Sequence, residues 1–188
     1  MTLLEEAIIF AAQVHNGQNR KGTQTPYILH PLEAAAIVAS MTDDLEIIAA
    51  AVLHDTLEDA HISMYEIADK FGERVADLVK SETENKREDL PASDTWLIRK
   101  QETVKALKDE KDLAVKMVAL GDKLSNIRAI YRDHLAIGDR LWERFNQKDP
   151  RMQAWYYRAI ADATTELDHY PAWQEYSEIV EKVFPKIS

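Results

Sequence analysis

The chain has 188 residues and no cysteine, so it is long enough to bury a hydrophobic core, and any metal site must use His, Asp or Glu. Its formal net charge of −10 disfavours non-specific binding to nucleic acid, but a small anionic ligand can still bind where positive charge is concentrated. The N-terminus lacks the basic segment of a signal peptide, and no apolar run approaches the roughly 18 residues that span a bilayer. We therefore expect a cytoplasmic protein with no nucleic-acid or membrane partner.

The first third of the chain shows helical patterns interrupted by one loop. Apolar residues at helical spacing predict a helix over 3–15, and a basic loop with two glycines and a proline follows over 16–26. Proline is favoured in a first helical turn, so Pro31 predicts that a second helix runs to about Met41. Thr42-Asp43-Asp44 predicts an N-terminal cap for a third helix that leads into His54.

The rest of the chain also shows helical spacing. Ser63 and Glu66 form a capping-box pattern, and Gly72 ends the short helix that they begin. The polar segment 82–94 predicts an exposed loop, and Asp94 is expected to cap the helix after it. The expected helices are 63–71, 73–81, 94–108, 112–132 and several over 136–184, with breaks at Gly138, near Pro150 and at Pro171. No useful stretch alternates like a strand, so the predicted fold class is all-α.

The sharpest motif is His54-Asp55-Thr56-Leu57-Glu58-Asp59, which directly follows an apolar stretch. Adjacent His and Asp can chelate one metal from a helix end, and ionisable groups on an apolar element are costly to bury unless they are paired or metal-bound. A His-Asp pair alone recurs freely, so for the pair by itself a solvated helix end with a capping carboxylate is the favoured interpretation.

Two further positions give this motif its weight. Asp122 lies on the apolar stripe of the long helix, where a carboxylate needs either a core Arg or Lys or a metal as its partner. His30 directly precedes Pro31 and, read alone, is a structural or exposed histidine. Two imidazoles and two carboxylates suit a borderline divalent ion such as Mn, Fe, Co or Zn. That donor set consists of His30, His54, Asp55 and Asp122.

This ligand order resembles that of the HD phosphohydrolase superfamily, and longer segments narrow the resemblance to the Rel/Spo alarmone enzymes. The segments 15–22 (HNGQNRKG) and 26–31 (PYILHP) look like the first hydrolase motif of that family, and His54 to Asp59 looks like the second. The segment 71–79 (FGERVADLV) is similar to the following helix, and 120–128 (LGDKLSNIR) looks like the fourth motif. The match covers roughly residues 1–132.

The resemblance implies a fold, an activity and a cofactor. The fold would be a single HD-domain helical bundle over 1–188, with its metal site between helices. The family motifs would lie within about 1–132, and the part over about 133–188 would be divergent. The activity would be that of a stand-alone hydrolase that removes the 3′-pyrophosphate of guanosine 3′,5′-bis(diphosphate)-like alarmones and leaves a nucleoside 5′-diphosphate. The cofactor would be Mn²⁺.

The resemblance also implies a role for each matching residue. The implied metal ligands are His30, His54, Asp55 and Asp122. The residues implied to position and deprotonate the attacking water are Glu58 and Asp59. The residues implied to face the nucleotide substrate are Arg20, Lys21 and Asn126. Without the resemblance, Arg20 and Lys21 read as a solvated loop pair, although they supply positive charge that an acidic chain otherwise lacks.

Departures from the family pattern leave two alternatives open. Gly121 stands where the family more often has Ala, segment 82–94 is more acidic, and the chain diverges after Arg128. The cluster Trp155-Tyr156-Tyr157 could stack a base, but an amphipathic core helix explains it more simply. One alternative is a hydrolase acting on another phosphorylated nucleotide, such as the 2′- or 3′-phosphate of a dinucleotide cofactor. The other is a non-catalytic nucleotide- or protein-binding HD module, against which intact Glu58 and Asp59 argue.

Overall fold

The computed structural model describes residues 1–59, 62–87 and 89–185, with the Asp59 side chain outside the described part. Over these residues the chain is helical, and its single isolated β-bridge joins Asn19 to Pro26 in the loop after the first helix. The helices are α1 (Leu3–Val14), α2 (Leu29–Ala39), α3 (Leu45–Leu53), α4 (Thr56–Asp59), α5 (Met64–Phe71), α6 (Glu73–Glu82), α7 (Ala92–Asp109), α8 (Leu113–Ile137), α9 (Pro150–Ala163) and α10 (Pro171–Val183), with 3₁₀ turns η1 (Gly138–Arg144) and η2 (Thr165–Leu167). The all-α prediction is confirmed.

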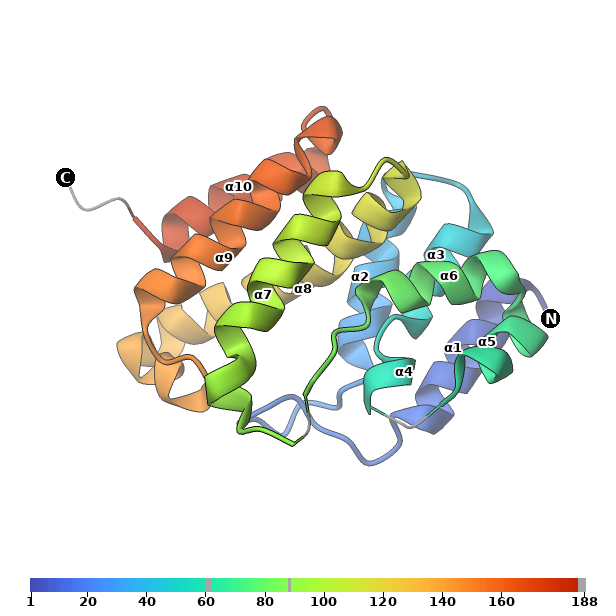
Figure 1. Ribbon diagram of the computed structural model, residues 1–188, viewed down its shortest axis with the longest axis horizontal. Coiled ribbons are helices and arrows are strands. Elements are labelled where there is room, and N and C mark those ends of the chain that lie inside the picture. The colour runs from blue at the N-terminus through green and yellow to red at the C-terminus, as the bar shows by residue number, and fades with distance from the viewer. Residues whose placement is uncertain (60–61, 88, 186–188) are drawn as a thin grey trace.

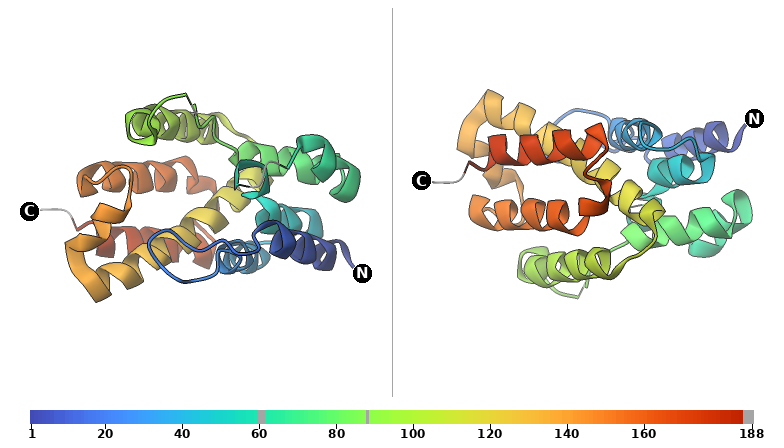
Figure 2. Two further views of the ribbon diagram at one scale, coloured as in Figure 1. Left: turned by 90° about the horizontal axis from the view of Figure 1, so that it is seen from below. Right: turned by 90° about the horizontal axis from the view of Figure 1, so that it is seen from above.

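Helix α8 crosses the middle of the molecule and separates two groups of helices (Figure 1). Helices α1, α3, α5 and α6 lie toward the N-terminal end, while α7, α9 and α10 lie toward the C-terminal end, as both views in Figure 2 show. Helix α8 packs extensively against both α2 and α10. It is therefore the element that connects the motif-bearing part of the chain to the divergent part.

Side-chain caps fix several helix starts where the sequence predicted them. The Asp44 carboxylate accepts from the Glu46 N–H at 3.0 Å and begins α3. Ser63 and Glu66 form the predicted capping box of α5, and Gly72 ends that helix with a φ of +95°. Among the described helices, none combines the length and apolarity that crossing a bilayer requires.

Three details of the predicted helices were wrong. Asp94 is not a cap, because α7 already begins at Ala92 after Pro91. Helix α8 continues past Arg132 to Ile137, where Gly138 takes a positive φ of +60°. The segment 82–94 is not wholly exposed, because two of its carboxylates, Glu82 and Glu84, pair with largely buried cations of α7 and α8.

The close approach of α2 and α8 explains the unusual glycine. A Cβ on Gly121 would lie 2.7 Å from Cγ2 of Val38 and 2.9 Å from the carbonyl oxygen of Ala34, both on α2. A side chain at this position would therefore push the two helices apart. Since α2 carries His30 and α8 carries Asp122, Gly121 contributes to the short distance between these two residues.

Candidate metal centre and adjoining cavity

The four residues predicted as metal ligands converge at one buried point. His30 comes from the first turn of α2, His54 and Asp55 from the break between α3 and α4, and Asp122 from the middle of α8. His30 Nε2 lies 3.1 Å from Asp122 Oδ1 and 3.5 Å from Asp55 Oδ2. His54 Nε2 lies 3.0 Å from Asp55 Oδ2 and 3.7 Å from Asp122 Oδ1. Helix packing thus assembles residues that are up to 92 positions apart in the sequence.

Hydrogen bonds at the outer ring nitrogens orient both imidazoles. His54 Nδ1 lies 2.8 Å from the carbonyl oxygen of Ala51, which can only accept, so this nitrogen carries the hydrogen in the neutral ring. His30 Nδ1 lies 2.9 Å from the hydroxyl of Ser125. In each ring Nε2 is therefore the atom that faces the two carboxylates, as is usual for a metal-binding histidine.

The donor set fits a divalent cation. One atom each from His30, His54 and Asp122 lies within 4.8 Å of the others, and Asp55 Oδ2 approaches both rings. His54 Nε2 is buried and has no hydrogen-bond partner. An unprotonated Nε2 beside buried carboxylate oxygens is electrostatically unfavourable unless a cation lies between them. The described residues therefore form a group that could hold a metal ion.

The pKa shifts of His54 and Asp122 also indicate that the cluster favours a positive charge. Burial lowers the pKa of the His54 imidazole, but Asp55 and Asp122 outweigh burial and hold that pKa well above its ordinary value. Burial raises the pKa of Asp122, yet the neighbouring Lys123 and the two imidazoles hold it well below its usual range. A proton on His54 thus takes the place of a cation when no metal is bound.

Three further side chains orient the carboxylates. The sequence had given no role to Tyr27 or Lys123, and it had assigned Asn126 to the substrate. The hydroxyl of Tyr27 donates to Asp55 Oδ2 at 2.7 Å. The Lys123 ammonium bonds to Asp122 Oδ2, and the amide of Asn126 bonds to Asp122 Oδ1. Tyr27 and Lys123 lie inside the motifs that carried the family resemblance, so their position in those motifs was the signal available for them.

The carboxylate of Glu58 bonds to groups outside the four predicted metal ligands. Its Oε1 accepts from the Glu84 N–H at 2.6 Å, and its Oε2 lies 3.5 Å from Nζ of Lys86. Burial raises the pKa of the Glu58 carboxyl above its ordinary value. These contacts come from the 83–87 segment and from neither histidine. Asp59, the second residue predicted to act on water, has a side chain outside the described residues.

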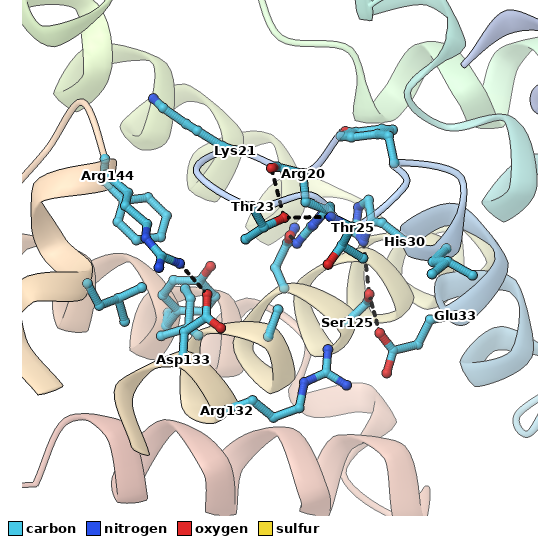
Figure 3. Close-up of a pocket in the computed structure, with 18 residues that line it drawn as sticks. Arg20, Lys21, Thr23, Thr25, His30, Glu33, Ser125, Arg132, Asp133 and Arg144 are labelled. Carbon is cyan, nitrogen blue, oxygen red and sulfur yellow. Dashed lines mark hydrogen bonds and ion pairs between the residues drawn. The ribbon is translucent and has the colours of Figure 1, made fainter. Parts of the chain in front are cut away.

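A cavity of about 650 Å³ opens beside the metal centre (Figure 3). His30 lies in its wall together with all three residues predicted to face the substrate, Arg20, Lys21 and Asn126. Arg20 Nη2 donates to Asn126 Oδ1 at 2.8 Å, and Asn126 in turn bonds to Asp122, so the loop arginine is connected to the metal centre. Two more cations line the cavity, Arg132 from α8 and Arg144 from η1.

The divergent C-terminal part forms the opposite wall. Arg144 Nη1 pairs with Asp133 Oδ2 at 2.7 Å, and its Cδ would lie 2.8 Å from a Cβ on Gly22. Lys21 Nζ donates to Asn146 Oδ1 at 3.2 Å. The loop that carries Arg20 therefore rests on residues of and directly after η1. The family resemblance implied that the region after Arg128 lies near the base and the 5′-phosphates, but its divergent sequence gave no role to Arg144 or Asn146 individually.

The aromatic cluster of α9 is mainly core, which is the simpler of the two interpretations of the sequence. Tyr156 and Tyr157 are buried, and Tyr157 stacks on Phe184 with ring centroids 6.0 Å apart. Tyr157 also lines the cavity, whereas Trp155 does not. Of the three aromatic residues, Tyr157 is thus the one that a ligand in the cavity can contact.

Comparison with known proteins places these features in a family. A family model described as "HD domain" matches residues 7–140. A zebrafish (Danio rerio) protein named guanosine-3′,5′-bis(diphosphate) 3′-pyrophosphohydrolase MESH1 is 37% identical over 133 residues, which cover 69% of this chain and 70% of that protein. An Aquifex aeolicus protein named guanosine-3′,5′-bis(diphosphate) 3′-pyrophosphohydrolase is 38% identical over 128 residues, which cover 68% of this chain but 18% of that protein. The chain therefore spans under a fifth of the Aquifex relative.

Two solved structures share the fold. The crystal structure of lmo0812 from Listeria monocytogenes EGD-e superposes with a TM-score of 0.73 at 30% identity, covering 84% of this chain and 99% of that one. A metazoan ortholog of SpoT, described as hydrolysing ppGpp, superposes with a TM-score of 0.77 at 22% identity, covering 97% of this chain and 96% of that one. At that identity the second likeness concerns the fold alone, and it extends over the divergent C-terminal helices.

Proposed function

Because this chain belongs to the HD-domain family, in its Rel/Spo-type branch, we propose that it is a Mn²⁺-dependent 3′-pyrophosphohydrolase of guanosine 3′,5′-bis(diphosphate)-like nucleotides. The observation that carries the proposal is the shared cavity wall, in which His30 of the metal centre lies beside Arg20 and Lys21. One cavity thus joins a divalent-ion donor set to the positive charge that a polyphosphate needs. The named activity of the zebrafish and Aquifex relatives supports the same substrate class.

We assign the metal to His30, His54, Asp55 and Asp122. When bound, the ion lowers the pKa of a coordinated water and polarises a phosphoryl oxygen. Two imidazoles and two carboxylates accept several borderline divalent ions, so the choice of Mn²⁺ rests on the family resemblance. Lys123 and Asn126 hold the two oxygens of Asp122, and Tyr27 holds Asp55 Oδ2, so the carboxylates keep their orientation with and without the ion.

In the proposed reaction, Arg20 and Lys21 bind the nucleotide phosphates and Asn126 keeps Arg20 in place. Glu58 accepts a proton from the attacking water, with Asp59 assisting, and the raised pKa of Glu58 suits a group that must take up a proton near neutral pH. The water oxygen forms a bond to the phosphorus attached to the 3′-oxygen, and the bond between that phosphorus and the 3′-oxygen breaks. The 3′-oxygen takes up a proton, so pyrophosphate and a nucleoside 5′-diphosphate leave.

A nucleotide panel tests this assignment against both alternatives. The panel contains guanosine and adenosine nucleotides with a 3′-diphosphate and a dinucleotide cofactor with a 2′-phosphate, each assayed with Mn²⁺ for pyrophosphate and for phosphate. Release of pyrophosphate from a 3′-diphosphate is the expected result. Release of phosphate from the dinucleotide alone would establish the other hydrolase, and tight binding without any turnover would establish a binding module.

Three further expectations belong to this proposal. Residues 1–188 act as one hydrolase unit, the divergent part after residue 132 supplying the second wall of the cavity. The substrate partner is a small nucleotide and not a nucleic acid. The reaction takes place in the cytoplasm.

A further inference from the structure

A chain of polar groups leads away from the metal centre through the outer nitrogen of His30. The hydroxyl of Ser125, on α8 one turn after Asp122, lies 2.9 Å from His30 Nδ1. The same hydroxyl donates to Oε2 of Glu33 at 2.8 Å (Figure 3). His30 and Ser125 are buried, with exposed fractions of 4% and 1%, whereas the Glu33 side chain is 27% exposed, so the bond between His30 and Ser125 is the one shielded from bulk water.

The carboxylate decides which way the hydrogens point. An ionised Glu33 can only accept, so the single hydrogen of the Ser125 hydroxyl is committed to it. The hydroxyl can then only accept from His30, which places a hydrogen on Nδ1 of that ring. His30 Nε2 is left with its lone pair directed at Asp122 and Asp55, where a metal ligand needs it.

We propose that Ser125 and Glu33 are positioning residues that fix the tautomer and the orientation of His30 for metal binding. This inference rests on the metal-binding part of the proposed function and not on the identity of the substrate. Hydrogen-bond partners of a metal-binding histidine commonly change metal affinity about 10- to 100-fold. Ser125 and Glu33 lie in the motif-bearing part of the chain, but the resemblance assigned neither a role.

The chain of contacts continues into the divergent part of the molecule. Arg128 Nη1 lies 3.2 Å from Glu33 Oε1, and the same guanidinium binds both carboxylate oxygens of Glu175 on α10, at 2.7 and 2.6 Å. Arg128 binds Glu33 Oε1 and leaves Glu33 Oε2 for Ser125. An alternative account is that Glu33 merely helps to dock α10 onto α8 through Arg128, and the control variant below separates the two.

The test measures the tautomer of His30 and the affinity for Mn²⁺ in the full-length protein. In metal-free protein at pH 8, imidazole ¹⁵N shifts should show the hydrogen of His30 on Nδ1. In Glu33→Ala the Ser125 hydrogen is free to turn toward His30, so the hydrogen should move at least in part to Nε2. Both Ser125→Ala and Glu33→Ala should bind Mn²⁺ about 10- to 100-fold more weakly.

Two controls exclude a merely structural effect. Glu175→Gln weakens the bidentate pair with Arg128 but leaves Ser125 untouched, so the tautomer and the Mn²⁺ affinity should stay within about twofold of the wild type. Thr164→Val removes another fully buried hydroxyl, one that donates to the Ile160 carbonyl at the end of α9 and accepts from the Trp173 indole of α10, and it should leave both readouts unchanged.

The outcomes separate this inference from the proposed function. An unchanged tautomer and unchanged Mn²⁺ affinity in Ser125→Ala and Glu33→Ala would overturn the positioning role, even if the wild type hydrolyses its nucleotide. A loss in Glu175→Gln equal to that in Glu33→Ala would overturn it in favour of helix docking. If the wild type hydrolyses no nucleotide but Glu33→Ala shifts the tautomer and weakens Mn²⁺ binding, the positioning role holds and the substrate assignment fails.

Discussion

The two walls of the cavity are held in place by different forces. The metal wall is His30 with the other predicted ligands packed behind it, and His30, His54 and Asp122 are exposed by only 4%, 2% and 6%. The facing wall is held by more exposed polar contacts such as Arg144–Asp133, whose side chains are 27% and 38% exposed. Packing fixes the first wall, while exposed ion pairs contribute only about 0–1 kcal/mol each to the second. We therefore expect mutations in the metal wall to change turnover, and mutations in the facing wall to change substrate binding.

Asp122→Ala should have the largest effect, because it removes a ligand from the packed wall. We expect hydrolysis to fall at least about 10³-fold and Mn²⁺ content to fall with it, since metal catalysis contributes several kcal/mol. Turnover assays and metal analysis of the purified variant check both. Asp77→Ala removes an exposed carboxylate of α6 as a control. Retained Mn²⁺ in Asp122→Ala would contradict the ligand assignment.

Glu58→Gln should separate chemistry from metal binding within the same wall. The shape is kept and the base is lost, so turnover should fall about 10²-fold while Mn²⁺ stays bound. Burial raises the pKa of Glu58, so the acid limb of the wild-type rate profile should lie above the ordinary glutamate range and should disappear in the variant. Loss of Mn²⁺ as complete as in Asp122→Ala would show that Glu58 is a ligand.

Glu82 gives the metal wall a pH-dependent stability. Burial raises its pKa from 4.5 to about 7, and Lys123 Nζ lies 4.0 Å from its Oε2. The folded protein therefore holds a proton that the unfolded chain releases, so this contribution to stability is present below pH 4.5 and lost as pH rises toward 7. In metal-free protein, Glu82→Gln should become more stable than the wild type by up to about 3 kcal/mol between pH 5 and 8. Denaturant unfolding of both proteins at pH 5 and at pH 8 measures this difference in stability. A difference that does not change with pH would contradict the prediction.

Gly121→Ala tests how closely α2 and α8 must pack to hold the metal wall. The added Cβ would meet Val38 Cγ2 at 2.7 Å, and such overpacking costs about 1–3 kcal/mol, against a gain of about 1 kcal/mol in helix propensity. The melting temperature should fall by about 2–4 °C, and Mn²⁺ should bind more weakly because His30 moves away from Asp122. Combining Gly121→Ala with Val38→Ala should restore part of the melting temperature and part of the Mn²⁺ affinity. An increase in melting temperature would show that α2 accommodates the side chain.

The sequence predicted the metal wall far better than the facing wall, for a physical reason. Buried His and Asp on apolar helices are costly without a partner, which made Asp122 and the His54-Asp55 pair candidates, and the ligand order of the HD family joined them with His30 into one set. All four converge in the structure, and the all-α fold and the family assignment are confirmed. The roles of these residues in catalysis stay predictions.

The facing wall could not be predicted from local patterns. Arg144 reaches its place only because η1 folds back against the loop at Gly22, and that contact joins residues 122 positions apart. Outside that wall, Glu84 looked solvated in the sequence, yet it forms largely buried pairs with Arg99 and Lys100 of the next helix. Exposed ion pairs and loop contacts leave no periodic signal, so they follow from the assembled structure alone.

Arg144→Ala should have the smallest effect and should be confined to substrate binding. It removes the pair with Asp133 and the support under Gly22, so the loop carrying Arg20 loses order. We expect KM to rise about fivefold, corresponding to roughly 1 kcal/mol of binding, with kcat and Mn²⁺ affinity unchanged. Steady-state kinetics and metal titration measure the three quantities.

A matched control is available on α9. Arg151 pairs with Asp149 at 2.7 Å in the same manner as Arg144 with Asp133, but its side chain is 87% exposed and lies outside the cavity. Arg151→Ala should therefore leave KM unchanged. A fall in kcat or in Mn²⁺ affinity in Arg144→Ala, with Arg151→Ala unaffected, would show that the exposed wall also shapes the metal centre. The separation between chemistry and substrate choice would then be wrong, because the loop contacts of Arg144 would extend through Arg20 and Asn126 to Asp122.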